Sequence, residues 1–313
     1  MNPLISIIIP TYNRAHLIGE TLDSVLAQTF RDWECIIVDD KSKDATQELM
    51  EFHTARDSRF KFFIRPKIKI KGANSCRNYG FEKSTGKYIQ WFDSDDIMRA
   101  DCLKIKLNKI TEGNWDFVVA KLENFLPDGT SNQPVYNRSE NIIFEDYLFR
   151  RTNWITHDAL TSRRTIEKYH LRFNEYMSSD QEYNYYCKLL SRTTNGVYID
   201  EILVKRRIHP SSIQNTIDRT SFTYTQELFK NRYLTFLDIQ PFLSEKTKQD
   251  YLDQIMTIYY SGIGKRIVLK PRKLFHLIIK NKGIPKLTYY MFSLVSNYYL
   301  GKGFWLLQKA KGK

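Results

Sequence analysis

Long apolar runs are missing from this sequence of 313 residues, and none approaches the roughly 18 consecutive apolar residues of a membrane-spanning helix. Its densest apolar segment, Tyr289–Leu300, is interrupted by Ser293, Ser296 and Asn297. The N-terminus has no basic stretch before its short apolar run, which Pro10 follows directly. The sequence therefore predicts neither a spanning helix nor a signal peptide.

Cysteine is scarce, and its positions form no pattern. Cys35, Cys76, Cys102 and Cys187 lie far apart, without the spacing of a metal site, so we expect reduced thiols in a cytosolic protein. No fixed-period repeat or low-complexity tract is present. With 42% hydrophobic and 27% charged residues the chain has the composition of a folded soluble protein, and its length allows one large or two modest domains.

Acidic residues are absent after Asp253, although the whole chain has 48 Lys+Arg, 35 Asp+Glu and a net charge of +13. The segment from Lys265 to Lys313 holds 12 Lys and Arg, so the first 264 residues are close to neutral. Basic segments interleaved with aromatic residues are typical of membrane-surface elements. A helical subdomain packed on the body and a dimerisation surface are the alternatives. Nucleic-acid binding is not expected, because no recognition motif accompanies the charge.

Two nucleotide-binding motifs are also missing. No GxGxxG follows the first predicted strand, which counts against NAD binding, and no GxxxxGK[ST] occurs, which excludes a P-loop ATPase.

Strand and helix patterns alternate through the first 120 residues. Apolar, β-branched segments predict strands at 4–9, 34–38, 60–64, 88–92 and 116–120, the first of them stopping at Pro10. Helical spacing predicts helices at 17–26, 44–55, 73–83 and 103–110. Such short units predict a parallel α/β sheet with helices on both faces, which binds ligands beyond the carboxyl ends of its strands.

The pattern changes after residue 120. We expect a turn at 127–130, helices at 144–150 and 181–190, and short strands at 197–199 and 202–208. From about Phe222 onward the pattern is helical, and one helix is expected to start at Pro271 and end at Gly283.

Three carboxylates, Asp93, Asp95 and Asp96, follow the predicted strand at 88–92. Carboxylates this close repel one another unless a cation neutralises them. A Mg²⁺ or Mn²⁺ ion held by one or two of them keeps open positions for the oxygens of a diphosphate. The alternative is solvated charge and an N-cap for the helix near Ala100.

Other polar residues at strand ends and helix starts are ambiguous when taken singly. Asp39 could accept hydrogen bonds from a nucleobase or ribose, or could cap a turn. Arg77, one turn into a helix led by Gly72, could contact a diphosphate or lie on the surface. Asp180 at a helix start and His209 after a strand are more often a cap and a structural histidine.

Four segments, taken in order, resemble family 2 glycosyltransferases of the GT-A fold. They are Ile5–Asn13 (ISIIIPTYN), Val38–Asp44 (VDDKSKD), Arg77–Gly80 (RNYG) and Phe92–Asp96 (FDSDD). The resemblance covers residues 4 to about 110 and extends more weakly to Arg207–Ile213. It implies a Rossmann-like α/β fold with a mixed, mostly parallel sheet flanked by helices, followed by a helical C-terminal extension.

The resemblance also implies roles for particular residues. The nucleotide-sugar would be bound by residues at the strand ends and on one helix, namely Pro10, Thr11, Tyr12, Asn13, Asp39, Asp40, Arg77, Asp93 and Ser94. Asp93, Asp95 and His209 would hold Mn²⁺ or Mg²⁺, with Asp95 the more direct ligand. Asp180 would be the catalytic base. Glu182 is the reserve candidate, because Ser179 replaces the acid that usually precedes the base.

The resemblance implies an inverting hexosyltransferase that is dependent on a nucleotide-sugar, UDP being the commonest nucleotide in the family. The acceptor would be a hydroxyl of a glycan or of a lipid-linked molecule in surface polysaccharide biosynthesis. A catalytic domain would span residues 1–215, with a donor-binding half at 1–120 and an acceptor-side half at 121–215. The basic, helical region at 216–313 would bind an anionic membrane, which places the enzyme in the cytoplasm on the inner face of the membrane. Homo-oligomerisation is left open.

Two other functions compete with this prediction. A sugar nucleotidyltransferase would carry a Gly-rich basic loop directly after the first strand, which Pro10–Arg14 does not supply. A non-catalytic, membrane-associated scaffold with a transferase-like fold is opposed by the complete Asp93-Ser94-Asp95 motif and by Asp180.

Overall fold

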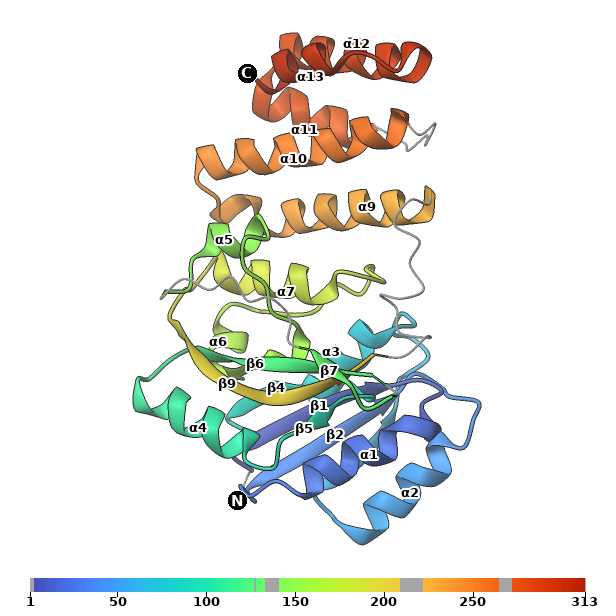
Figure 1. Cartoon of the computed structure of the whole chain (residues 1–313), viewed down its shortest axis with the longest axis vertical. Coiled ribbons are helices and arrows are strands. Elements are labelled where there is room, and N and C mark those ends of the chain that lie inside the picture. The colour runs from blue at the N-terminus through green and yellow to red at the C-terminus, as the bar shows by residue number, and fades with distance from the viewer. Residues whose placement is uncertain (1–2, 127, 133–140, 209–221, 265–271, 313) are drawn as a thin grey trace. The chain divides into compact units, whose positions relative to one another are not determined.

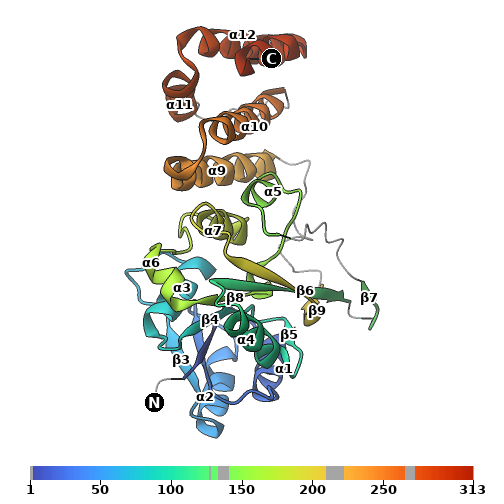
Figure 2. The same ribbon diagram turned by 90° about the vertical axis from the view of Figure 1, so that its left-hand side faces the viewer.

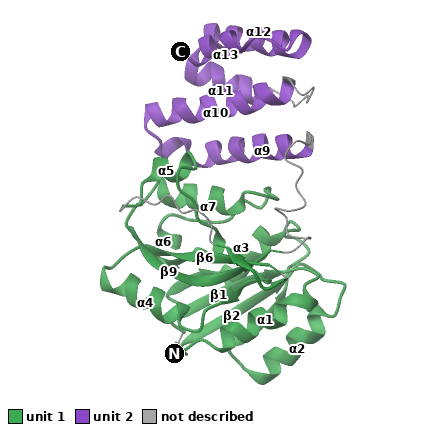
Figure 3. Cartoon of the chain, viewed as in Figure 1, with its two compact units in different colours: residues 1–210 green, residues 211–313 purple. Residues whose placement is uncertain are grey.

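The computed structural model describes residues 3–126, 128–132, 141–208, 222–264 and 272–312 (Figure 1). The chain forms two compact units, Met1–Pro210 and Ser211–Lys313 (Figure 3). The first unit contains the sheet, and the second is helical in its described part.

A nine-stranded sheet runs through the described part of the first unit, in the order β3-β2-β1-β4-β8-β6-β9-β5, with β7 beside β6. The strands are β1 (Ile5–Thr11), β2 (Trp33–Asp39), β3 (Phe60–Ile64), β4 (Tyr88–Trp91), β5 (Ile97–Met98), β6 (Phe117–Phe125), β7 (Ser131–Asn132), β8 (Ala159–Ser162) and β9 (Gly196–Arg207). Strands β3, β2, β1 and β4 run parallel, as do β6 and β9, whereas β8 is antiparallel to both β4 and β6. The predicted fold class, a mixed and mostly parallel sheet, is confirmed.

Helices cover both faces of this sheet (Figures 1 and 2). They are α1 (Ala15–Leu26), α2 (Thr46–Arg56), α3 (Ala73–Lys83), α4 (Cys102–Glu112), α5 (Phe144–Leu148), α6 (Arg163–Lys168) and α7 (Gln181–Leu190), with a short 3₁₀ turn at Thr156–Asp158. Alternate residues of β1, Ile5, Ile7 and Ile9, pack in one core with apolar residues of α1 and α4. On the opposite face, α3 packs closely against β1. A Cβ atom on Gly80 of α3 would lie only 2.5 Å from Ile8 Cγ2.

Two strand predictions were wrong in detail. Strand β1 continues through Pro10 to Thr11. Pro10 pairs with Val38 of β2, whereas β4 pairs with β1 only as far as Ile8, so a residue without an N–H is tolerated where β1 has no strand partner on its β4 side. The segments expected as two short strands, 197–199 and 202–208, form the single strand β9, whose pairing with β6 shifts register between Val119 and Leu122.

The second unit consists of α9 (Phe222–Ile239), a 3₁₀ turn at Gln240–Phe242, α10 (Glu245–Gly264), α11 (Arg272–Lys282), α12 (Ile284–Leu300) and α13 (Phe304–Lys311). Helix α11 ends just before Gly283, as predicted, and the expected start at Pro271 lies outside the described residues. Tyr290 of α12 donates its hydroxyl to the Met256 carbonyl at 2.8 Å and so ties α12 to α10. Within the described residues, no helix is both long enough and apolar enough to cross a membrane.

Candidate functional site

Polar residues meet where β1 and β2 end side by side, with Thr11 opposite Asp39. Asn13 adopts a positive φ of 51° there, and its N–H donates to Ser42 Oγ at 2.8 Å. Ser42 in turn donates its own N–H to Asp39 at 2.9 Å. Thr11 Oγ1 is buried and has no hydrogen-bond partner within the described structure. The network therefore fixes the Asp39 carboxylate, and the pairing of β1 with β2 places Thr11 at the same edge of the sheet.

Asp40 and Tyr12, which were also predicted to contact the nucleotide-sugar, have different surroundings. Asp40 is buried and forms an ion pair with Arg65, whose side chain is also buried. Tyr12 is partly exposed at the same edge, with the Lys71 ammonium 4.5 Å from its ring centre. Tyr12 is thus accessible to a ligand, whereas the carboxylate of Asp40 is taken up by its ion pair with Arg65.

Arg77 connects two segments of the site. This buried side chain donates from Nη2 to Asp93 Oδ1 at 2.7 Å and from Nη1 to Gln181 Oε1 at 2.6 Å. Burial would raise the pKa of Asp93, but Arg77, followed by His157, outweighs burial and lowers it. Asp93 is therefore held as a carboxylate beside the first residue of α7.

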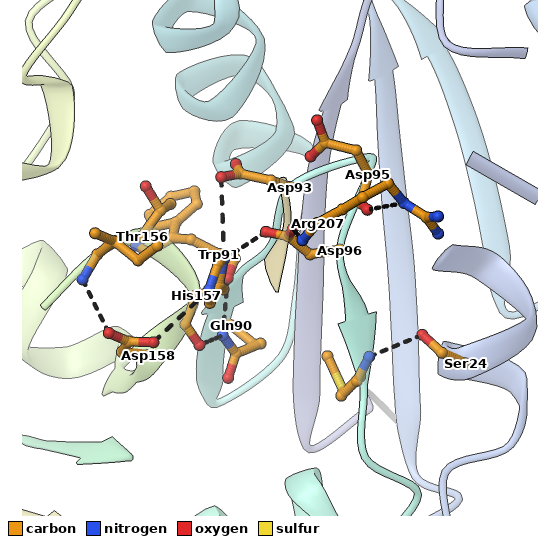
Figure 4. Close-up of polar contacts among 12 residues, drawn as sticks. Ser24, Gln90, Trp91, Asp93, Asp95, Asp96, Thr156, His157, Asp158 and Arg207 are labelled. Carbon is orange, nitrogen blue, oxygen red and sulfur yellow. Dashed lines mark hydrogen bonds and ion pairs between the residues drawn. The ribbon is translucent and has the colours of Figure 1, made fainter. Parts of the chain in front are cut away.

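The other two carboxylates of the motif point in different directions (Figure 4). Asp96 is buried, and its carboxylate lies 2.9 Å from Nδ1 of His157. Asp95 is turned away from this histidine, and its carboxylate lies 3.8 Å from Arg14. Arg207, at the end of β9, donates its backbone N–H to Asp96 at 2.9 Å, and its guanidinium to the Asp95 carbonyl at 3.0 Å.

Sequence reasoning missed His157, which lies on the 3₁₀ turn before β8. Its ring is fully buried, with Asp93 at 4.0 Å in addition to Asp96. Burial would lower the pKa of His157, but the carboxylates, Asp96 first, raise it. The contact could not be read from the sequence, because His157 is far from Asp93–Asp96 along the chain. The pairing of β8 with β4 brings the two segments together.

Asp93, Asp96 and His157 form the group within the described residues that could hold a metal ion. Their potential ligand atoms all lie within 4.8 Å of one another. Ligands on opposite sides of a Mg²⁺ ion are about 4.2 Å apart, so the three side chains lie close enough together to share one such cation. Carboxylate oxygens with one imidazole also suit Mn²⁺. His209, the predicted histidine ligand, lies outside the described residues.

A buried lysine, Lys106, holds the backbone of His157 through a hydrogen bond. Lys106 of α4 donates to the His157 carbonyl at 2.8 Å and to Gln90 Oε1 at 2.9 Å. Gln90, on β4, donates its own amide to the same carbonyl at 2.9 Å. Both partners are fully buried. This pair fixes the backbone that carries His157.

The start of α7 brings two carboxylates to the site. Asp180 has a positive φ of 53° and makes no side-chain capping hydrogen bond, so the simple capping role does not apply. Its carboxylate lies 2.9 Å from the Arg150 guanidinium. The pKa of Glu182, one residue beyond Gln181, is raised by burial and by the charge of Asp180. Asp180 and Glu182 thus flank the residue that Arg77 holds.

Comparison with known proteins gives a family. The family model described as glycosyl transferase family 2 matches residues 6–172. This range includes Thr11, Arg77, Asp93 and His157, and it ends before Asp180.

Curated relatives match shorter parts of the chain. An uncharacterized glycosyltransferase of Rickettsia typhi is 28% identical over 69% of this chain and 67% of its own length. The putative teichuronic acid biosynthesis glycosyltransferase TuaG of Bacillus subtilis is 32% identical over 47% of this chain and 57% of its own. The Escherichia coli glucosyltransferase WfgD is 36% identical over 38% of this chain and 46% of its own. The matched region thus spans 46 to 67% of the lengths of these relatives.

A solved structure shares the fold. The 1-349 fragment of S. aureus TarS in complex with UDP-GlcNAc has a TM-score of 0.70 at 18% sequence identity. The similarity covers 94% of this chain and 89% of that one.

Proposed function

The chain belongs to glycosyltransferase family 2 and is a transferase enzyme, and from that premise we propose that it transfers a sugar from a UDP-sugar to a hydroxyl of a lipid-linked or polysaccharide acceptor. Its relative WfgD is named as a transferase from UDP-Glc to a diphosphoundecaprenol-linked sugar, and TuaG is named for teichuronic acid biosynthesis. The observation that carries the proposal is the double contact of Arg77 with Asp93 and Gln181, which joins the acidic motif to the start of α7.

The donor would lie along the carboxyl ends of β1, β2 and β4. Thr11 and Asp39 offer a hydroxyl and a carboxylate to the nucleoside, and the exposed ring of Tyr12 can stack on the base. Arg77 would contact the diphosphate from beside Asp93, because a guanidinium forms charge-assisted hydrogen bonds with phosphate oxygens. Pro10 and Ser94 are buried at this edge and would shape it. Asp40 would act indirectly by fixing Arg65.

A divalent cation would neutralise the negative charge that develops on the leaving diphosphate. Asp93 is 31% exposed and can present its carboxylate to both cation and donor, whereas His157 and Asp96 are buried behind it. Asp95 remains a proposed ligand through rotation away from Arg14, and His209 remains one as well. EDTA is expected to abolish transfer, and added Mn²⁺ or Mg²⁺ to restore it. Full activity in EDTA would remove the cation from the proposal.

Asp180 would take the proton of the acceptor hydroxyl, which then attacks the anomeric carbon from the face opposite the diphosphate. This direct displacement inverts the configuration of the transferred sugar. A general base of this kind typically contributes about 10²–10⁴-fold to the rate. Glu182 is the alternative base, because it lies in the first turn of α7 and its pKa is raised by burial and by the charge of Asp180.

Two matched variants test the base. Asp180→Asn and Glu182→Gln each replace a carboxylate by an amide of the same shape, two residues apart. Transfer by Asp180→Asn should fall about 10²–10⁴-fold with UDP binding nearly unchanged, while Glu182→Gln should lose much less. The reverse order would assign the base to Glu182, and wild-type transfer by both would exclude α7 from proton transfer.

The division of labour within the chain is proposed along the same lines. Residues 1–120 would bind the donor, 121–215 would face the acceptor, and 216–313 would bring the enzyme to the cytoplasmic face of a membrane that holds a lipid-linked acceptor. The competing functions separate in one assay. Release of UDP from a UDP-sugar would support the transferase. Release of pyrophosphate from UTP would support a nucleotidyltransferase, and the absence of both products would support a scaffold.

A further inference from the structure

Helix α12 exposes large apolar side chains on the face that points away from the other helices of the second unit. Phe292 is 61% exposed and Tyr299 is 76% exposed, and both lie on one side of the helix. The same side carries four other exposed apolar residues, Ile284, Met291, Val295 and Tyr298. With 100° per residue these positions form one continuous stripe. A stripe of this kind on a folded unit marks an interaction surface.

The opposite side of α12 is already used by the fold of the second unit. Tyr290, Ser293, Leu294 and Asn297 are buried there. Asn297 donates its amide to the Tyr260 carbonyl of α10 at 2.7 Å. The inner side therefore fixes the orientation of α12, and the outer stripe is not needed to hold the unit together.

Helix α13, which follows α12 after a short turn, also exposes large aromatic side chains. Phe304 and Trp305, in its first turn, are 59% and 65% exposed. Lys309 lies one turn further on, with its ammonium 5.5 Å from the Trp305 ring centre, and Lys302 is exposed in the turn between the two helices. We call the exposed side chains of α12 and α13, with these two lysines, the α12–α13 surface.

We propose that the α12–α13 surface binds an anionic lipid bilayer, with the apolar stripe in the headgroup region and the lysines at the phosphates. This inference deepens the membrane role proposed above for residues 216–313 and rests on it. Tyrosine and tryptophan favour the interface between lipid and water, and lysine and arginine next to them are attracted by anionic headgroups.

Charge decides between lipid and a second copy of the chain. Residues 254–313 contain no Asp or Glu, so two copies that met through this surface would bring only positive charges together. A surface that is both apolar and exclusively basic is complementary to anionic lipid, which supplies the missing negative charge.

The test is cosedimentation of the full chain with phosphatidylglycerol–phosphatidylcholine vesicles, with pure phosphatidylcholine vesicles for comparison. The variant Phe292→Ser/Tyr299→Ser removes the centre of the stripe. The control Phe52→Ser/Phe242→Ser removes two exposed phenylalanines elsewhere. We expect wild type and control to bind the anionic vesicles, the stripe variant to bind at least about tenfold more weakly, and Lys302→Glu/Lys309→Glu to lose the preference for anionic lipid.

Equal vesicle binding by wild type and the stripe variant would overturn the proposal. So would a wild-type dimer that the stripe variant dissociates in analytical ultracentrifugation without any vesicle binding, because the surface would then join two copies. UDP binding in the presence of Mn²⁺ is measured on the same samples and should be unchanged. Vesicle binding without UDP binding would count against the proposed enzyme function alone, and the opposite result against the α12–α13 surface alone.

Discussion

Replacing Arg77 by lysine keeps a positive charge in the site but removes the fork that reaches two segments at once. The guanidinium contacts Asp93 and Gln181 through different nitrogens, at 2.7 and 2.6 Å. A lysine has its three donors on a single nitrogen and lacks the planar fork, so it cannot reproduce both contacts in their present geometry. The variant also loses the guanidinium that lies 5.1 Å from the Phe173 ring centre.

The lost contact sets the expected magnitude. A hydrogen bond that involves a charged group contributes about 1.5–3 kcal/mol. If the ammonium stays with Asp93, the start of α7 loses its link to the acidic motif. Transfer should then fall about 10- to 150-fold if the full contribution is needed in the transition state.

The assay is UDP release from a UDP-sugar with acceptor present, combined with thermal unfolding. Arg59→Lys is the matched control, because Arg59 also forms a forked ion pair, with Asp57, away from the site. Transfer by Arg77→Lys within twofold of that by the wild type would refute the role of the double contact. A similar loss of transfer in both variants would point to a general effect of losing an arginine.

Three other variants test residues that stabilise the structure around the site. Glu34 is buried, and although burial raises its pKa, hydrogen bonds led by the one from Lys61 lower it below the ordinary 4.5. In urea titrations at pH 7, the free energy of unfolding of the wild type should exceed that of Glu34→Gln by about 1–3 kcal/mol. This difference should shrink as the pH falls below 4.5. Lys106→Met should lower both the unfolding temperature and transfer, because the His157 carbonyl loses a donor; unchanged transfer would make Lys106 purely structural. Gly80→Ala should cost about 1–3 kcal/mol in thermal unfolding through overlap of the new methyl with β1.

Much of the fold was predictable from local patterns. Segments rich in aromatic and β-branched residues, such as Phe60–Ile64, and helices with clear starts, such as Ala73–Lys83, have the predicted bounds. Strand β8 was missed, because its short sequence Ala-Leu-Thr-Ser has no strand pattern of its own. It is a strand because β4 and β6 flank it on both sides.

The site was predictable where it follows strand ends. Thr11, Asp39 and Asp93 are brought to one edge of the sheet because parallel strands end together. The contact of Asp96 with His157 was not predictable, since no local pattern relates residues on separate elements. The role of Asp180 and the metal role of Asp95 stay predictions.

The central claim is that the edge formed by Thr11, Asp39, Arg77 and Asp93 binds a nucleotide-sugar together with a divalent cation. A thermal-shift screen of nucleotide-sugars with Mn²⁺ tests it most directly. A ligand at 100 times its dissociation constant stabilises a protein by about 2.7 kcal/mol, which is a measurable shift. The account predicts stabilisation by a UDP-sugar that disappears in EDTA and in Asp93→Asn. No stabilisation by any nucleotide-sugar, or the same shift in Asp93→Asn as in the wild type, would contradict it.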